Sequence, residues 1–442
     1  MHKYIFLPLF LYALACCSTP ALAQSGDEAP SIWTRENATG SWNGLRLKLE
    51  DHGLGVDVNL ITEVMGNIAG GIKQEAVFIE NLDFKVLMDT EKLIGWSGSN
   101  ILLSTLQNNG QSISAHAGDV QGISNIEAVK TIRLFEAWIQ QNLFKNKLSI
   151  LGGLYDINSE FDFMESASLF IQSSQGLGGD FAGSGLIGPP TFPIAGLGGR
   201  IKYVPNRKIY LQAGIFDGVP GAPGEIDHAD FSWNKRGGSL VMAELGLLSF
   251  GDNTFKPQQG LTTRQQRSHV GREVSSDYQS KIAFGAWNYS RNYVSERYGL
   301  SRPGITDNQN DQGIYILADW KWNPNPQKPY QQLSIFGRIG FAENEVSRFK
   351  SYGGGGITFK GILPGDPNGL MGLSIASVQD SKLFQRINPG IDDFETAIEW
   401  TYLSKVVPWL NVQPDLQYII SPGTAPNREN VWILGLRTDI IL

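Results

Sequence analysis

The stretch Phe78-Ile79-Glu80-Asn81-Leu82-Asp83-Phe84-Lys85-Val86-Leu87-Met88 decides the fold of this chain. Its apolar residues Leu82, Phe84 and Val86 alternate with the polar residues Asn81, Asp83 and Lys85. A period of two gives a β-strand one apolar and one polar face. The same alternation returns in four further stretches, at 314–322, 396–402, 410–420 and 432–442.

Period-two segments bounded by turn residues can be counted along the whole chain. Sixteen are found, at 54–66, 76–89, 99–109, 133–142, 147–156, 199–204, 209–217, 239–250, 278–289, 313–322, 333–342, 353–361, 371–379, 394–403, 409–420 and 431–442. Most have about the 9–11 residues that a tilted strand needs to cross a bilayer, although 199–204 is short. The number is even, as bacterial single-chain membrane barrels require.

A soluble β-sandwich would also alternate, so the lengths of the connections matter. Connections after strands 2, 4, 6, 10, 12 and 14 are compact, and those after strands 3, 5, 7, 9 and 13 are long. Short turns at one end and long loops at the other are typical of an outer-membrane barrel with periplasmic turns. The polar segment 251–277 breaks this rule, and it indicates either a missed strand or a periplasmic insertion. We therefore predict an all-β protein, a transmembrane antiparallel β-barrel over 54–442.

The N-terminus has the features of a secretory signal peptide over residues 1–23. A positive start is followed by the apolar run 4–15 and by the small residues Ala21 and Ala23 of a cleavage site. A lipoprotein signal with lipid on Cys16 is the competing interpretation. Residues 24–53 are then expected to form an N-terminal periplasmic segment.

Composition excludes several other classes of protein. Both cysteines, Cys16 and Cys17, fall within the expected signal peptide, so neither a disulfide nor a cysteine metal site is expected. The formal charge of −7 comes without a basic block, which argues against nucleic-acid binding. After residue 15 no apolar run approaches the length of a membrane helix.

The longest connection, 157–198, follows the fifth strand and is rich in glycine and proline. Loops of this length in compact proteins are commonly functional or disordered. We expect this one to fold into the lumen and constrict it, with a short helix within 161–175. A loose surface loop is the alternative, although the apolar residues Phe163, Leu169 and Phe170 disfavour full exposure.

An exported glycan-active enzyme is a rival class. Asp156 with Glu160, or Glu395 with Glu399, offers a carboxylate pair, but glycosidases hold their two carboxyls about 5–10 Å apart. Residues four apart on a strand are about 13 Å apart. The histidines show no metal-ligand spacing, and Gly183-Ser184-Gly185 is not a nucleophile elbow. We therefore expect neither an enzyme nor a metal or other cofactor.

Several motifs together resemble the OprB-type carbohydrate-selective porins, over essentially the whole chain that follows the signal peptide. They are Gly40-Ser41-Trp42-Asn43-Gly44, Gly70-Gly71, Ser124-Asn125-Ile126-Glu127-Ala128, Arg133-Leu134-Phe135-Glu136-Ala137-Trp138, Gly152-Gly153, Glu160-Phe161, Gly199-Arg200, Phe216-Asp217-Gly218 and Gln413-Pro414-Asp415-Leu416-Gln417-Tyr418. The resemblance implies a sixteen-stranded outer-membrane channel that passes monosaccharides and similar polyols by passive diffusion.

The resemblance also implies a narrow eyelet lined by arginine and glutamate. The candidates that match family positions are Arg133, Glu136, Trp138, Asp156, Glu160 and Arg200. Strand alternation puts Arg133 and Glu136 on opposite faces unless a bulge intervenes. We favour Glu136 in the lumen, because Phe135, Ala137 and Ile139 suit lipid. A structural wall ion pair is an equally open role for the arginines and glutamates.

Sugar chemistry fits such an eyelet. Carboxylates, arginine and amides exchange hydrogen bonds with hydroxyls, and an aromatic ring stacks on the sugar's apolar face. A general small-solute porin without sugar selectivity is the alternative function, and a phosphate channel is disfavoured because the inner faces mix acids with amides. Outer-membrane lipid is the expected surrounding, and the chain is either a monomer or a homotrimer.

Overall fold

The computed structural model describes residues 31–221, 229, 231, 233, 238–250, 278–291, 293–298 and 310–442. The expected signal peptide 1–23 and the segment 251–277 lie outside these residues.

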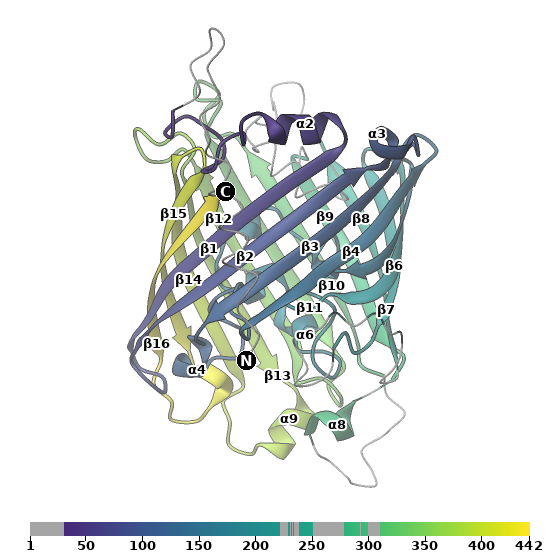
Figure 1. The fold of residues 1–442 in the computed structure, drawn as a ribbon. Coiled ribbons are helices and arrows are strands. Elements are labelled where there is room, and N and C mark those ends of the chain that lie inside the picture. The colour runs from purple at the N-terminus through teal and green to yellow at the C-terminus, as the bar shows by residue number, and fades with distance from the viewer. Residues whose placement is uncertain are drawn as a thin grey trace, which may run out of the picture.

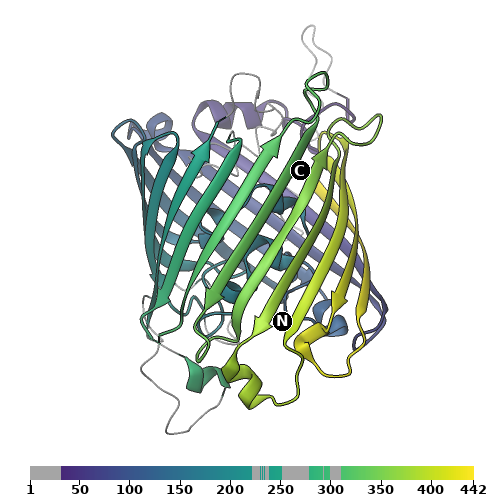
Figure 2. The ribbon, with the colours of Figure 1, turned by 180° about the vertical axis from the view of Figure 1, so that it is seen from behind.

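The described residues form sixteen antiparallel strands that close into one barrel (Figures 1 and 2). The strands are β1 Leu54–Ala69, β2 Ala76–Asp89, β3 Ser99–Gly110, β4 Thr131–Leu143, β5 Leu148–Tyr155, β6 Gly196–Asn206, β7 Ile209–Asp217, β8 Ser239–Ser249, β9 Ser280–Tyr289, β10 Gln312–Trp322, β11 Gln332–Ala342, β12 Phe349–Lys360, β13 Leu370–Asp380, β14 Phe394–Val407, β15 Leu410–Ile420 and β16 Val431–Ile441. Each strand pairs with its neighbours in sequence, and β1 pairs with β16 to close the barrel. The predicted barrel and its sixteen strands are confirmed.

Several predicted strands are too short, among them the fourteenth, which ends at Val407 rather than at 403. The sixth begins at Gly196 rather than at 199, and the twelfth at Phe349 rather than at 353. The glycine-rich start of β6, 196–199, has low strand propensity, so the sequence pattern misses it. The start of β12 contains a register shift between Phe349 and Ser351, which interrupts the alternation. In the barrel, hydrogen bonds to two flanking strands keep them extended.

Short helices and helical turns occupy the connections. They are α2 Leu45–Asp51, α3 Thr90–Ile94, α4 Ser114–Ala117, η1 Ile157–Ser159, η2 Ser166–Leu169, α5 Ser173–Gly176, α6 Gly179–Ala182, α8 Val294–Tyr298, α9 Lys382–Ile387 and η3 Pro422–Thr424. None of the described helices is long and apolar enough to cross a membrane.

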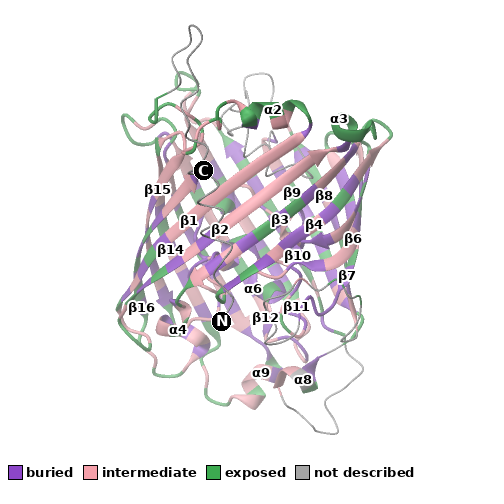
Figure 3. Ribbon diagram, viewed as in Figure 1, coloured by how far each residue is buried: buried purple, intermediate pink, exposed green. Residues whose placement is uncertain are grey.

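The two faces of the strands differ in chemistry as expected. On β10, Ile314, Ile316 and Trp320 are exposed, whereas Tyr315 and Asp319 are buried. Exposed and buried residues alternate in this way along most of the strands (Figure 3). The outer surface therefore carries an apolar band, and the inner face is largely polar.

Among the connections that the structure describes in full, those at the end with α2 and α3 have two to nine residues, and those at the opposite end have six to forty. The first is here called the short-turn end and the second the long-loop end. Figure 1 shows α2 and α3 at the short-turn end, and α4, α8 and α9 at the long-loop end. The described part of the N-terminal segment, 31–53, lies at the short-turn end. There Arg46 Nη2 donates to the carbonyl of Leu442 at 2.9 Å, and Trp409 Nε1 donates to the carbonyl of Ile32 at 2.6 Å.

The apolar band makes a testable prediction about stability in lipid. Ile316 lies outward near the middle of β10, and Val406 lies outward near the end of β14. Ile316→Arg is expected to lower the free energy of unfolding in bilayers by about 2–4 kcal/mol, because arginine is charged at the bilayer midplane. Val406→Arg, at the interface, is expected to lower it by only about 0–1 kcal/mol. Urea unfolding in liposomes measures both, and equal effects would contradict this placement of the band.

Candidate functional site

The connection between β5 and β6, residues 156–195, is here named the β5–β6 segment. It contains η1, η2, α5 and α6. The single short helix expected within 161–175 is wrong in detail, since two separate turns, η2 and α5, take its place. Phe170 and Gln172 between them have extended backbones, so the helix does not continue.

Hydrogen bonds connect this segment to strands around most of the barrel. The described partners include Arg200 on β6, Gln212 on β7, Glu244 on β8, Lys281 on β9, Asp319 on β10, Arg338 on β11, Tyr352 on β12, Glu399 on β14 and Gln413 on β15. A segment bonded to inward-facing side chains on so many sides lies within the barrel. Many of its residues are buried there, including Phe161, Phe170 and Phe181.

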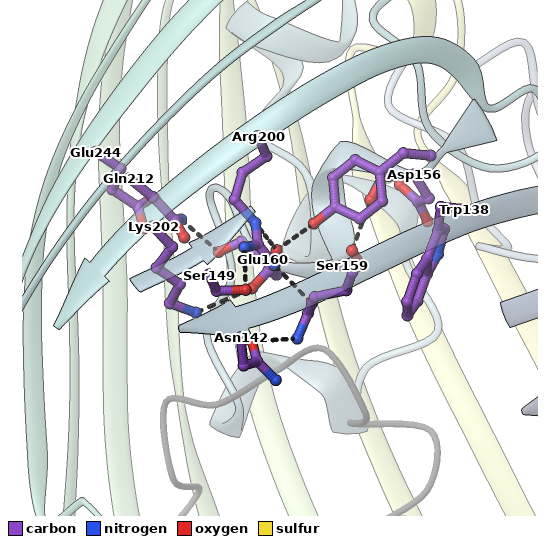
Figure 4. A network of polar contacts seen from close by, with 12 residues as sticks. Trp138, Asn142, Ser149, Asp156, Ser159, Glu160, Arg200, Lys202, Gln212 and Glu244 are labelled. Carbon is purple, nitrogen blue, oxygen red and sulfur yellow. Dashed lines mark hydrogen bonds and ion pairs between the residues drawn. The ribbon is translucent and has the colours of Figure 1, made fainter. Parts of the chain in front are cut away.

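Glu160 is the centre of the first attachment point (Figure 4). Its Oε2 accepts from Arg200 Nε at 2.7 Å and from the Tyr155 hydroxyl at 2.6 Å. Its Oε1 lies 2.9 Å from Lys202 Nζ. One carboxylate from the segment thus meets two cations and a phenol from strands β5 and β6.

The arginine in this cluster is satisfied on all three nitrogens. Arg200 Nη1 donates to Ser149 Oγ at 2.7 Å, and Nη2 donates to Gln140 Oε1 at 3.0 Å. The side chains of Arg200 and Glu160 are 0% and 3% exposed. This cluster attaches the segment to the barrel wall and is closed to water. Of the roles that the sequence left open for Glu160 and Arg200, it fits the structural ion pair.

Burial by itself raises the pKa of the Glu160 carboxyl, but the charges of Arg200 and Lys202 outweigh it and lower that pKa to about 2. The carboxylate therefore stays ionised well below neutral pH.

Arg338 on β11 forms a second attachment point. Its Nε donates to Asp162 Oδ1 at 2.7 Å and its Nη1 to Asp180 Oδ1 at 2.6 Å. The rings of Tyr315 and Tyr352 lie on the guanidinium, with their centroids 5.1 and 5.2 Å from Cζ. Arg338 therefore holds two distant parts of the segment to one strand.

Glycines make room for the Arg338 attachment. A Cβ on Gly178 would lie 2.1 Å from Arg338 Nη1, and one on Gly340 would lie 2.1 Å from Asp180 Oδ2. Larger residues at either position would push the ion pair apart.

Glu136 and Trp138 on the inner face of β4 form a second group with Asp156, the first residue of the β5–β6 segment. Trp138 Nε1 and the backbone N–H of Asp156 each lie 3.2 Å from Glu136 Oε1 and donate to it. Asp156 in turn accepts from the N–H of Asn158 at 2.9 Å, which starts η1. Glu136 thus holds the beginning of the β5–β6 segment.

A β-bulge on β4 changes the facing that simple alternation predicts. Ser104 pairs with Glu136 and Thr105 with Leu134, so Phe135 is the extra residue. A bulge brings neighbouring residues onto one side of a sheet. Arg133 and Glu136 are accordingly both buried, and the favoured inward position of Glu136 agrees with the structure.

The expectation that Phe135 faces lipid is wrong. It is 7% exposed, and its ring meets Phe192 edge to face at 6.1 Å between centroids. The bulge turns this residue inward, where it packs beneath the β5–β6 segment with Leu106, Leu154 and Ala195.

Five of the six candidates from the sequence therefore fall into two clusters. One cluster contains Glu160 and Arg200. The other contains Glu136, Trp138 and Asp156, and Arg133 lies beside it on β4. Sequence reasoning missed Lys202, Tyr155, Asp162, Asp180 and Arg338. Lys202 and Arg338 stand at inward positions of alternating strands, a signal that could have found them, but their partners are distant in sequence. No group of three or more potential metal ligands occurs among the described residues.

A closed sixteen-stranded barrel with an apolar outside, a polar inside and an internal segment defines an outer-membrane porin. A family model described as carbohydrate-selective porin, OprB family, matches residues 73–442. The chain belongs to this family, and it is an outer-membrane channel for carbohydrates.

Individual relatives are distant but cover the chain. Porin B of Pseudomonas aeruginosa is 22% identical over 431 residues, which span 91% of this chain and 90% of that protein. The high-pH structure of Pseudomonas putida OprB superimposes with a TM-score of 0.74 at 18% identity, covering 93% of this chain and 100% of the other. Its low-pH structure gives a TM-score of 0.58 over 92% and 99% of the two chains.

The Glu160 cluster makes a pH-dependent prediction. Because the pKa of Glu160 is lowered from 4.5 to about 2, its stabilising contribution is present above pH 4.5 and is lost as the pH falls through 2. Glu160→Gln is expected to lower the free energy of unfolding at pH 7 by about 3–5 kcal/mol, since two buried cations lose their counter-charge. The difference from wild type should shrink as the pH falls from 4.5 toward 2 in urea titrations.

Glu345→Gln is the matched control, because the Glu345–Arg386 pair is largely exposed. Its effect is expected to be about 0–1 kcal/mol. A Glu160→Gln effect of that size, or one that does not change with pH, would contradict the assigned role.

Proposed function

We propose that the β5–β6 segment narrows the lumen to an eyelet that passes monosaccharides and small polyols by diffusion, without chemical change. The observation that carries this proposal is the attachment of the segment, by buried charged groups, to strands around the barrel. A segment held in this way keeps a defined shape, which size and hydroxyl selection require.

The sequence candidates have different parts in this proposal. Arg133, Glu136 and Asp156 supply polar groups beside the eyelet, and the Trp138 indole holds the Glu136 carboxylate by its N–H. Glu160 and Arg200 position the segment and do not touch the solute, because their hydrogen-bonding atoms are all engaged within the cluster.

We further propose an orientation for the barrel. Short turns of outer-membrane barrels face the periplasm, so the short-turn end and the N-terminal segment 24–53 lie there. The exposed apolar band then contacts outer-membrane lipid.

Liposome swelling tests the selectivity. Liposomes that carry the purified protein are expected to swell faster in glucose than in a charged amino acid of similar size, because the eyelet exchanges hydrogen bonds with neutral hydroxyls. Equal rates would favour the alternative, a general small-solute porin. Absence of swelling in every solute would contradict the channel.

Glu136→Gln tests the eyelet itself. The substitution removes a charge but keeps a hydrogen-bonding side chain, so sugar flux is expected to fall more than salt conductance. The magnitude should be about three- to tenfold, the range for weakening one hydrogen bond to a charged group. Glu91→Gln, at an exposed position of α3, is the control with the same charge change. Parallel losses of sugar flux and salt conductance would place Glu136 outside the eyelet.

A further inference from the structure

The ion pair between Asp83 and Lys85 on β2 is more exposed than those of the Glu160 cluster and of Arg338. Lys85 Nζ lies 2.6 Å from Asp83 Oδ2, and the two side chains are 29% and 21% exposed. In the Glu160 cluster and around Arg338, by contrast, no side chain of the described ion pairs is more than 3% exposed. Asp83 and Lys85 are therefore charges that reach water in the lumen.

Both residues face inward. They lie at alternate positions of β2 together with the buried residues Val77, Ile79 and Asn81, and therefore on the same face of the strand. The opposite face carries Phe78, which is exposed on the outside of the barrel.

Cross-strand pairing extends this ion pair into a row that reaches the β5–β6 segment. Asp57 on β1 pairs with Lys85, Lys85 with Ser104 on β3, and Ser104 with Glu136 on β4. Side chains of directly paired residues are neighbours on one face. Ser104 Oγ also donates to Asp83 Oδ1 at 3.0 Å. The row ends at Glu136, which accepts from the first N–H of the segment.

Other accessible polar groups lie on the same side of the barrel. Asn59 on β1 and Asp439 on β16 face inward and are only partly buried, and Asn411 Nδ2 donates to Asp439 Oδ2 at 3.1 Å. The attachments of the β5–β6 segment described above reach β4, β6–β12, β14 and β15. Inward polar side chains of β1, β2 and β16 that lie beyond these attachments are therefore partly exposed, and the part of the lumen beside them is here called the passage.

We propose that Asp83 and Lys85 form a contact site for sugar hydroxyls and determine the specificity of this passage; the inference rests on the proposed sugar-selective function. The carboxylate accepts from one hydroxyl of a vicinal pair, and the ammonium donates to its neighbour. An exposed ion pair is weak, so opening it to admit a hydroxyl costs little. Contact remains weak enough for release, which conduction requires.

Glucose-dependent block of ion current through the full-length protein in planar bilayers tests this site. Lys85→Gln and Asp83→Asn are each expected to weaken the apparent glucose affinity about fivefold, because the neutral amide keeps a hydrogen bond but loses the assistance of the charge. Lys405→Gln is the matched control. Lys405 is a half-buried residue of β14, and it lies an even number of residues from the buried Glu395 and Glu399, so its side chain also faces inward. Its substitution changes the net charge by the same amount as Lys85→Gln. It should leave the glucose affinity within about twofold of wild type.

A charge-reversed double variant, Asp83→Lys with Lys85→Asp, separates recognition from folding. It restores a donor beside an acceptor, so it should recover part of the glucose affinity lost by the single variants. Potassium chloride conductance and resistance to denaturation by detergent report whether each barrel has assembled.

Two outcomes would overturn the proposal in distinguishable ways. Glucose affinities of Lys85→Gln and Asp83→Asn that match Lys405→Gln, in a wild-type channel that still selects sugars, would overturn this site alone. A wild-type channel that does not distinguish glucose from a charged solute of its size would overturn the proposed function as well.

Discussion

The rest of the structure depends on one constraint, the need to pair every backbone N–H and C=O group within a bilayer. Each unpaired group in hydrocarbon costs several kcal/mol, so an open sheet edge is not tolerated there. The pairing of β1 with β16, from Asn59 opposite Ile441 to Ala69 opposite Trp432, removes the last edges. Once the sheet is closed, each strand has an inner and an outer face, and lipid requires the outer one to be apolar.

Closure of sixteen strands also leaves an interior that side chains of the strands cannot fill. The chain fills part of it with the β5–β6 segment, whose backbone and charges must then be satisfied inside the barrel. Glu160 meets Arg200 and Lys202, while Asp162 and Asp180 share Arg338. Buried ion pairs offer little net stability against hydrophobic packing, but breaking one is costly, so they hold the segment in one place.

Charges inside the barrel consequently have two kinds of surroundings. Those of the Glu160 cluster, which hold the segment, are sealed, and the three nitrogens of Arg200 are all hydrogen-bonded, so they keep no capacity for a passing solute. Those along β1 and β2, such as Asp83 and Lys85, remain accessible to water. Residue type alone does not distinguish a solute contact from an attachment point, whereas exposure does.

The sequence by itself determined the class of fold, the number of strands, the facing of most residues and the position of the long internal connection. These features follow from the local sequence, because the alternation of apolar and polar residues and the turn residues can be recognised within each strand separately. Tertiary structure alone decided the bulge at Phe135, which puts Arg133 and Glu136 on one face, and the division of five of the six candidate residues into two clusters. It also decided the union of Arg338 with Asp180, 158 residues apart. Such contacts depend on how the barrel closes and on where the segment meets its wall. They cannot be predicted from the residues of one strand or one turn.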